Sequence, residues 1–393
     1  MKYFFNGSVF KSTFLFWLLC LSGAYLGAQN SILPGALQQD YLGQLKGKKV
    51  GVVAHQASLL PIAKQSVHLV DYLLENNINV QSVFAPEHGF RGTADAGEKI
   101  KNQTDPKTGL PIISLYGKNR KPTQEQIAKL DVLVFDLQDV GVRFYTYLST
   151  LHYVMEACAE NDIPLIVLDR PNPNIQYVDG PVLEEAHTSF VGMHPVPIVY
   201  GMTIGEYAQM INGEGWLKDN IRCKLTVMPI KNYSRNSTYE LPVRPSPNLP
   251  NAQAVALYPS LCLLEPTVIS VGRGTDFQFQ IYGHPKLPKG EFTFTPMPNF
   301  GAKSPKFKGV LCYGEDLTKV SHPKQLELKW LIRAFQNFPE PSEFFLKGFE
   351  RIAGNSSLRT QLISGMEETE IRNSWKPQLE VFKKIRAQYL IYH

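Results

Sequence analysis

Short apolar runs alternate with longer amphipathic stretches through the first part of the chain. The apolar runs occupy residues 49–54, 80–85, 112–116, 132–135, 165–168 and 225–230. Runs of this length, bounded by polar or turn-forming residues, are typical of strands buried on both faces of a parallel sheet. The pattern therefore predicts a sheet that helices cover on both sides.

The stretches between these runs have the spacing of amphipathic helices. Residues 63–75 and 146–160 each place apolar side chains on one face. Thr123 is a suitable N-cap for a helix through position 130, and Thr203 with Glu206 forms a capping box for a helix through position 212. Strands separated by helices of this size predict βαβ units and a mostly parallel sheet.

The regular alternation stops in residues 232–250, which are rich in Ser, Asn and Pro. We place a domain boundary there, so that residues 29–245 form an α/β domain and residues 246–393 a smaller α+β domain. In the second domain the pattern predicts strands at positions 277–282, 292–294 and 310–312, a short strand within positions 265–276, and helices at positions 325–335 and 377–389.

The N-terminus has the features of an export signal. Lys2 and Lys11 precede an apolar run at residues 14–21, and small residues at positions 27 and 28 offer a cleavage site. The run is too short for a membrane anchor. We therefore expect residues 1–28 to be removed as a signal peptide.

A lipoprotein is the alternative, because Cys20 lies within this segment. Leu19 before it is bulky where a lipidation signal usually has a small residue, so ordinary cleavage and release are favoured. Removal of the segment lowers the formal net charge from +5 to +3, with 38 basic and 35 acidic residues left. This balance, without any basic run, argues against a nucleic-acid partner.

The remaining cysteines and the glycine-rich turns give no sign of a cofactor or metal. Cys158 lies on the apolar stripe of a predicted helix, which is typical of a buried thiol, and the pairing of the four cysteines stays open. The chain has no CxxC or HExxH motif, and no GxGxxG follows a strand. We expect neither a zinc site nor a nicotinamide or flavin cofactor.

Polar side chains follow several of the predicted strands, at the edge of a parallel sheet where ligands bind. By order of strand they are His55 and Gln56; Glu87, His88 and Arg91; Asp136, Gln138, Asp139 and Arg143; and Asp169, Arg170 and Asn172. Such residues at one strand mean little, but at four strands they converge on one edge. The sequence therefore predicts a cleft there.

Residues 131–147, DVLVFDLQDVGVRFYTY, are the richest of these stretches. A buried strand is followed at once by acidic residues, then by Gly141, Arg143, Tyr145 and Tyr147. A core needs none of these side chains, which favours a strand that ends at a site, with Gly141 allowing the turn. The alternative is that the aspartates form turns and the tyrosines only cover the core.

Glycoside hydrolysis is one reaction that such a cleft supports. It needs a protonated carboxyl group beside the leaving oxygen and a second carboxylate near the anomeric carbon. Glu87 is the best acid candidate, because partial burial in its short loop favours the protonated form. Asp136 and Asp139 are candidates for the partner, and a turn-fixing role for Glu87 and His88 is an equal alternative.

The arginines and tyrosines of the same stretches suit a substrate with a sugar ring and an anionic group. Arg143 and Arg170 offer bidentate hydrogen bonds to a carboxylate, and Tyr145 and Tyr147 can stack on a sugar.

The second half adds two clusters. Asn248 lies in the rigid loop PSPN, and Glu265 precedes a predicted strand and the loop GRGTD, which contains Arg273 and Asp276. This loop is too short for a phosphate-binding P-loop and lacks its lysine. Arg273 could hold an anionic substituent, and the alternative is a tight turn with a surface Arg–Asp pair.

Long motifs in these stretches resemble one known family. They are PEHGFRG (86–92), DAGEK (95–99), TGLPIISLYG (108–117), DVLVFDLQDVGVRFYTY (131–147), LDRPNP (168–173), GPVL (180–183), YGMTIGE (200–206), RPSPN (244–248), ALYPSLCLLEPTVISVGRGTD (256–276) and FQFQIYGHP (277–285). From about position 48 to its end, the chain resembles the exo-β-N-acetylmuramidase family (NamZ-like), long catalogued as a bacterial domain of unknown function. One departure is His55-Gln56-Ala57, where the family usually has an asparagine-containing turn.

The resemblance implies a Rossmann-like α/β domain, a smaller C-terminal domain and a site in the cleft between them. It implies removal of N-acetylmuramic acid from the non-reducing end of peptidoglycan fragments, without a cofactor, in the periplasm. The lactyl carboxylate of that sugar would be received by Arg143, Arg170 or Arg273.

We therefore predict Glu87 as general acid, Asp139 as partner carboxylate and Tyr147 as a third catalytic residue. Asp136 ends its strand and is the more structural of the two aspartates. The residues predicted to bind substrate are His88, Arg91, Asp136, Arg143, Tyr145, Arg170, Asn172, Asn248, Glu265, Arg273 and Asp276.

Two other functions stay open at this point. One is a muropeptide-binding protein without activity. The other is a metal-dependent hydrolase with Glu87, His88, Asp136 and Asp139 as ligands, for which a single histidine is weak support.

Overall fold

The computed structural model describes residues 1, 31–38, 40–62, 65–91 and 103–393. The predicted signal peptide and the motif at 95–99 lie outside the described residues. The chain divides into two units, Met1–Ile32 and Leu33–His393. All helices and strands discussed below belong to the second unit.

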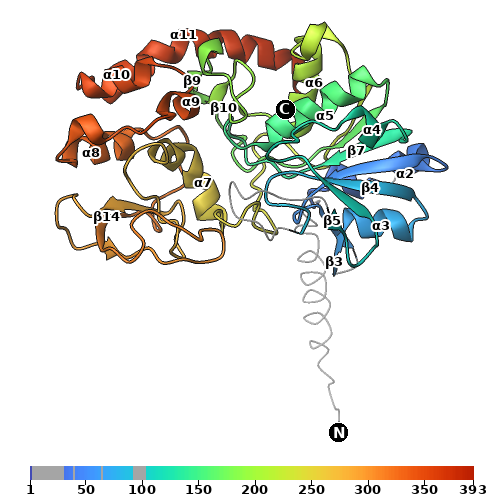
Figure 1. Cartoon of the computed structure of the whole chain (residues 1–393), viewed down its shortest axis with the longest axis horizontal. Coiled ribbons are helices and arrows are strands. Elements are labelled where there is room, and N and C mark those ends of the chain that lie inside the picture. Colours follow the sequence, from blue (N-terminus) through green and yellow to red (C-terminus); the bar gives the residue numbers. More distant parts are fainter. Residues whose placement is uncertain (2–30, 39, 63–64, 92–102) are drawn as a thin grey trace. The chain divides into compact units, whose positions relative to one another are not determined.

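A seven-stranded sheet in the order β11-β8-β7-β1-β4-β6-β5 organises the first half of the chain (Figure 1). Its strands are β1 (Lys49–Ala54), β4 (Asn79–Ala85), β5 (Gln103–Thr104), β6 (Pro111–Ser114), β7 (Val132–Asp136), β8 (Leu165–Leu168) and β11 (Leu225–Met228). All neighbours are parallel except β5, which pairs antiparallel with β6.

The six parallel strands, counted along the chain, have the order 3-2-1-4-5-6 of a doubly wound fold. The predicted fold class is confirmed: a Rossmann-like α/β sheet is followed by a smaller α+β part. Every residue of β7 and β8 is buried, as expected for strands covered on both faces. The helices of this half are α2 (Asp40–Leu45), α3 (Leu69–Glu75), α4 (Gln124–Ile127), α5 (Tyr147–Glu160) and α6 (Ile204–Gly213).

Three predicted helix starts have different outcomes. The capping boxes of Thr123 and Thr203 both form, so α4 and α6 begin where their polar caps indicate. The helix predicted from position 63 is wrong in its first part, because β3 (Gln65–His68) pairs with β2 (Leu59–Ile62) as a hairpin. Helix α3 begins only after His68, whose side chain accepts a hydrogen bond from Val70 N.

The second half contains short elements joined by long loops. Its strands are β12 (Ile281–His284), β13 (Thr293–Phe294) and β14 (Cys312–Asp316), which form one antiparallel sheet; β9 (Asp179–Val182) and β10 (Pro197–Val199) pair earlier in the chain. Its helices are α7 (Ala252–Leu261), α8 (Lys329–Asn337), α9 (Phe349–Ala353), α10 (Ser357–Ile363) and α11 (Glu368–Arg386). Helix α7 was not predicted, and the strand expected at 277–282 begins later because Phe279 has a positive φ of 54°.

The C-terminal segment returns to the first half. Helix α11 runs beside β9, and the chain then ends near α6 (Figure 1). The Tyr392 hydroxyl donates to the buried Asp169 carboxylate at 2.6 Å and accepts from Ile230 N at 2.7 Å. One main apolar core contains side chains from both halves, including Phe135, Tyr207 and Phe344. The last residues therefore complete the packing around β8 and β11.

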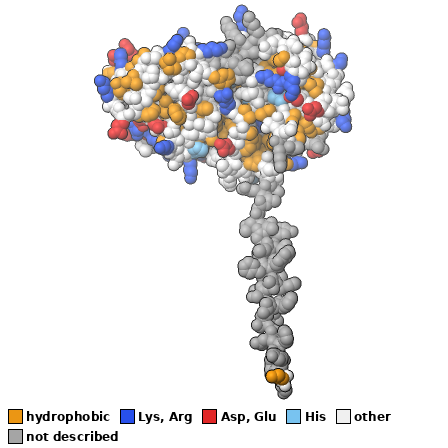
Figure 2. Space-filling view, turned by 90° about the horizontal axis from the view of Figure 1, so that it is seen from below, with side chains coloured by type: hydrophobic (Ala, Val, Ile, Leu, Met, Phe, Trp, Pro, Cys, Tyr) orange, Lys and Arg blue, Asp and Glu red, His pale blue; other side chains and the backbone are white. Residues whose placement is uncertain are grey.

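The surface shows charges of both signs. On the face in Figure 2, basic and acidic side chains are interspersed with apolar ones. Within the described residues, no helix has the length and apolar character needed to cross a membrane.

Substitution of Tyr392 tests the role of the C-terminus. We expect Tyr392→Phe to lower the free energy of unfolding by about 1–3 kcal/mol, because Ile230 N–H and Asp169 each lose a buried partner. Urea denaturation measures this. Tyr389→Phe is the matched control, since its hydroxyl donates to Glu214 from a partly exposed site. Equal effects of the two substitutions would contradict the prediction.

Candidate active site

Residues from both halves line a cavity of about 310 Å³ at the carboxyl edge of the sheet. Six of the predicted site residues line it: Glu87, His88, Tyr145, Asn248, Glu265 and Arg273. The remaining lining residues include Tyr116, Arg120, Thr146, Phe190, Tyr258 and Phe279. Among all lining residues, Glu87 and Glu265 are the two that carry a carboxyl group.

Glu87 follows β4 in a tight turn. The turn uses positive φ angles at His88 (70°) and Gly89 (79°), which brings the Glu87 side chain to the cavity. The Thr146 hydroxyl, immediately before α5, donates to Glu87 Oε2 at 2.9 Å. Tyr116 also hydrogen-bonds this carboxyl group; burial and the Glu87 charge raise the pKa of Tyr116 to about 12. Glu87 is thus held by neutral hydroxyl groups.

The buried His55 is linked to the main chain of Glu87 through Tyr147. His55 Nε2 lies 2.9 Å from Gln138 N, and a main-chain N–H can only donate, so the imidazole proton is on Nδ1. Nδ1 lies 3.1 Å from the Tyr147 hydroxyl, which in turn donates to Glu87 O at 3.4 Å. Burial, followed by the charge of Arg170, holds the pKa of His55 well below its usual value. The neutral ring therefore keeps one tautomer.

Tyr147 itself does not line the cavity. Its side chain is fully buried and packs edge-on against Tyr145 at 4.7 Å between ring centroids. Tyr145 does line the cavity, and its hydroxyl donates to Pro245 O at 2.9 Å. The structure thus places Tyr147 behind the cavity wall, where its hydroxyl contacts the main chain of Glu87.

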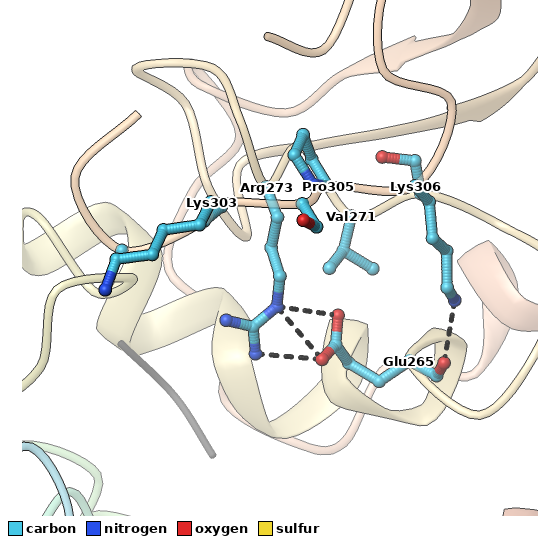
Figure 3. Close-up of a pocket in the computed structure, with 10 residues that line it drawn as sticks. Glu265, Val271, Arg273, Lys303, Pro305 and Lys306 are labelled. Atoms are coloured by element: carbon cyan, nitrogen blue, oxygen red, sulfur yellow. Dashed lines mark hydrogen bonds and ion pairs between the residues drawn. The ribbon is translucent and has the colours of Figure 1, made fainter. Parts of the chain in front are cut away.

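The second carboxyl group comes from the other half of the chain. Arg273 Nε and Nη2 both bond to the Glu265 carboxylate, at distances from 2.8 to 3.1 Å (Figure 3). Burial opposes ionisation of Glu265, but the charges of Arg273 and then Lys306 more than offset it, so its pKa lies below the ordinary value. Glu265 is therefore ionised at neutral pH.

Lys306 anchors the segment that carries this pair. Its amine donates to the carbonyl oxygen of Glu265 (Figure 3) and to those of Thr267 and Ile269. Glu265 and Arg273 also line a neighbouring cavity of about 450 Å³. The ion pair thus lies between two cavities, and the Arg273 guanidinium is bonded to the Glu265 carboxylate.

Asp139 was predicted as the partner carboxylate, but it does not line the cavity. It is 3% exposed; its Oδ2 accepts from Gly141 N at 2.7 Å and from the Tyr200 hydroxyl. Burial raises the pKa of Asp139 to about 6, although both hydrogen bonds favour its ionised form. The side chain holds the turn at Gly141, where φ is +80° and a Cβ would lie 2.2 Å from Asn172 Oδ1.

Arg143 and Arg170 were predicted to bind a substrate carboxylate, and neither reaches the cavity. The buried Arg143 guanidinium donates to four carbonyl oxygens, those of Pro181, Val196, Ile352 and Ala353. Burial lowers its pKa to about 9. Arg170 forms a buried bidentate pair with Asp136, with 2.8 Å between Nη2 and Oδ2. Neither arginine lines the cavity, because Arg143 is bonded to main-chain carbonyl oxygens and Arg170 to Asp136.

Three further predicted residues also lie elsewhere. Arg91 pairs with Asp105 at 2.8 Å, and the buried Asn172 donates to Met202 O. Asp276 is exposed and lines neither of the two cavities. Asn248 remains at the cavity, with its amide donating to Gly301 O at 2.7 Å.

Sequence reasoning missed Arg120, Tyr116 and Phe190. Tyr116 and Arg120 follow β6, so the rule applied to the other strands would have found them. Phe190 lies in a loop without a motif, and no sequence signal pointed to it.

Two carboxyl groups in different environments, facing one sugar-sized cavity, define a glycoside hydrolase site. Within the described ranges, no group of three or more His, Cys, Asp or Glu side chains could hold a metal ion. The ligand set of the metal-dependent alternative is not assembled, because Asp136 pairs with Arg170 and Asp139 with Tyr200.

The particular family follows from comparison with known proteins. The profile described as "Exo-beta-N-acetylmuramidase NamZ, N-terminal" matches residues 50–253, and the corresponding C-terminal profile matches residues 256–392. The chain belongs to the exo-β-N-acetylmuramidase NamZ family, which confirms the resemblance seen in its motifs.

A curated relative and two solved structures are similar to the chain over most of its length. The chain is 41% identical over 385 residues to the peptidoglycan β-N-acetylmuramidase NamZ of Bacillus subtilis (strain 168), covering 92% of this chain and 90% of the relative. A DUF1343 family protein from Bacteroides fragilis is 43% identical with a TM-score of 0.86, over 93% of this chain and 99% of that one. A second such protein from the same organism is 28% identical with a TM-score of 0.79, over 92% and 99%.

Asp139→Asn tests whether this carboxyl group takes part in the reaction. The amide oxygen can accept the same two hydrogen bonds, so we expect hydrolysis within about tenfold of wild type, whereas loss of a catalytic acid or base costs roughly 10²–10⁴. A chromogenic N-acetylmuramic acid glycoside provides the assay. A loss beyond about a hundredfold would restore Asp139 as the partner carboxylate.

The same variant has an expected pH signature. The pKa of Asp139 is about 6 in the folded protein, against about 4 in an unfolded chain. Ionisation of Asp139 is therefore less favourable in the folded protein, so the free energy of unfolding falls as the pH rises through this window. Asp139→Asn should remove that loss of stability between about pH 4 and 6, measured by urea unfolding.

Arg143→Met tests the structural role of the buried guanidinium. Four carbonyl oxygens lose their donor, so we expect the free energy of unfolding to fall by about 3–5 kcal/mol. Arg222→Met is the control on an exposed arginine, with an expected change below about 0.5 kcal/mol. Similar unfolding midpoints for Arg143→Met and wild type would refute this role.

Proposed function

We propose that the protein removes terminal β-linked N-acetylmuramic acid from the non-reducing end of peptidoglycan fragments, with Glu87 as general acid and Glu265 as the second carboxylate. The observation that carries the proposal is the cavity shared by these two groups. Family membership supports the exo-muramidase activity, and the curated relative is a peptidoglycan β-N-acetylmuramidase.

The two environments suit the two roles. Glu87 accepts a hydrogen bond from the Thr146 hydroxyl and is hydrogen-bonded to the Tyr116 hydroxyl, and both of these groups are neutral. Glu265 is kept ionised by Arg273 and Lys306. A protonated carboxyl group and an ionised one on the same cavity are what glycoside hydrolysis requires.

The reaction follows from these roles. Glu87 gives its proton to the glycosidic oxygen, and the bond between that oxygen and the anomeric carbon breaks with its electron pair going to the oxygen. The ionised Glu265 stabilises the positive charge that develops on the sugar. Water then adds to the anomeric carbon and gives a proton to the Glu87 carboxylate, which restores the acid.

We further propose that the protein acts in the periplasm after removal of residues 1–28. Support comes from the lysines and the apolar run of that segment and from the peptidoglycan substrate of the curated relative. Fractionation of the native cells, with mass analysis of the mature N-terminus, tests this.

Glu87→Gln tests the acid role. The amide cannot give a proton, so we expect turnover of a chromogenic N-acetylmuramic acid β-glycoside to fall by about 10²–10⁴. Wild type should release nothing from the N-acetylglucosamine analogue. Glu125→Gln, an exposed position on α4, is the control and should keep wild-type turnover.

Each result has a clear meaning. Near wild-type turnover by Glu87→Gln would exclude Glu87 as the acid. If wild type releases nothing from either glycoside, the exo-muramidase proposal fails and a muropeptide-binding role replaces it.

A further inference from the structure

Arg120 lies on the cavity wall, and its guanidinium has no carboxylate partner among the residues that the structure describes. It follows β6 and lines the cavity together with Glu87. Within the described part of the chain, its contact is with the ring of Phe190, and it forms no hydrogen bond or ion pair there. The other cavity arginine, Arg273, is bonded to Glu265.

From this arrangement we propose that Arg120 binds the lactyl carboxylate of the terminal sugar and thereby selects N-acetylmuramic acid over N-acetylglucosamine. This inference rests on the function proposed above and adds the residue that determines its specificity.

The aromatic residues beneath Arg120 hold its guanidinium in place. The Arg120 Cζ atom lies 4.5 Å from the Phe190 ring centroid. Phe190 in turn stacks on Tyr153, with an interplanar angle of 16°, and contacts Tyr116 at 6.1 Å between centroids. An arginine stacked by its face on a ring keeps its edge free, and that edge carries the donors for bidentate binding of a carboxylate. The wall therefore presents a fixed cation to the cavity.

The position of Arg120 relative to Glu87 suits the substrate. Both line the cavity together with Tyr116, which hydrogen-bonds the Glu87 carboxyl group and contacts Phe190, the ring beneath Arg120. Acid and cation thus share one wall. In N-acetylmuramic acid the lactyl ether is on the same ring as the anomeric carbon, so a sugar with its glycosidic oxygen at Glu87 brings its carboxylate toward that wall.

Selectivity follows from charge. N-acetylglucosamine has a hydroxyl group where N-acetylmuramic acid has the lactyl ether, so it offers Arg120 no anion. A charge-assisted hydrogen bond corresponds to about 10- to 100-fold in affinity. Lysine in place of arginine would restore charge but not the planar pair of donors.

Binding measurements separate this inference from catalysis. N-acetylmuramic acid and the methyl ester of its lactyl carboxylate are titrated by calorimetry into wild type, Arg120→Gln, Arg120→Lys and Arg222→Gln. Wild type should prefer the acid to the ester by about 10- to 100-fold. The Gln variant should lose this preference, the Lys variant should keep part of it, and the Arg222 control should keep all of it.

A Gln variant that keeps the preference for the acid would overturn the inference, and so would a wild type that binds acid and ester equally. The same variants are assayed with the chromogenic glycosides. If wild type hydrolyses the glycoside and Arg120→Gln keeps the preference for the acid, the role of Arg120 is refuted and the proposed function is not. If wild type hydrolyses neither glycoside and Arg120→Gln still loses the preference for the acid, the role of Arg120 is supported and the enzyme proposal is refuted.

Discussion

The guanidinium of Arg143 donates to two carbonyl oxygens from each half of the chain, and the arrangement of the cavity depends on this contact. Pro181 and Val196 belong to the β9–β10 region, while Ile352 and Ala353 end α9. Gly354 follows with a φ of +89°, and a Cβ there would lie 2.3 Å from Arg143 Nη2. Since Ile352 lines the cavity, the buried Arg143 guanidinium determines how far apart the sides of the cavity that come from the two halves lie.

Two carboxyl groups reach the cavity from different supports. Glu87 depends on the first half, through Thr146, Tyr116 and the buried chain from His55 to Tyr147. Glu265 depends on the second half, through Arg273 and Lys306. Two neutral hydroxyl groups hydrogen-bond Glu87, whereas Arg273 and Lys306 favour the ionised form of Glu265. The two carboxyl groups at the cavity thus come from different halves of the chain, each with its own set of contacts.

The sequence predicted the sheet well because its strands are short, apolar and buried on both faces, so that the pattern alone identifies them. It predicted the second half less well, because loops there are held by contacts such as Lys306 with three carbonyl oxygens, which no local pattern encodes. The same limit applies to the site. Glu87 and Glu265 were predicted as site residues from their type and position, and both line the cavity. Arg143 and Arg170 do not line it, because residue types do not reveal which arginine is bonded to carbonyl groups or to Asp136 inside the fold.

The contact between Tyr392 and Asp169 joins residues that lie far apart in the sequence. Asp169 directly follows β8, and its buried carboxylate accepts a hydrogen bond from Tyr392, 223 positions further along the chain. A side chain from the second half therefore completes the packing around a strand of the first half, so that folding of the two halves is coupled.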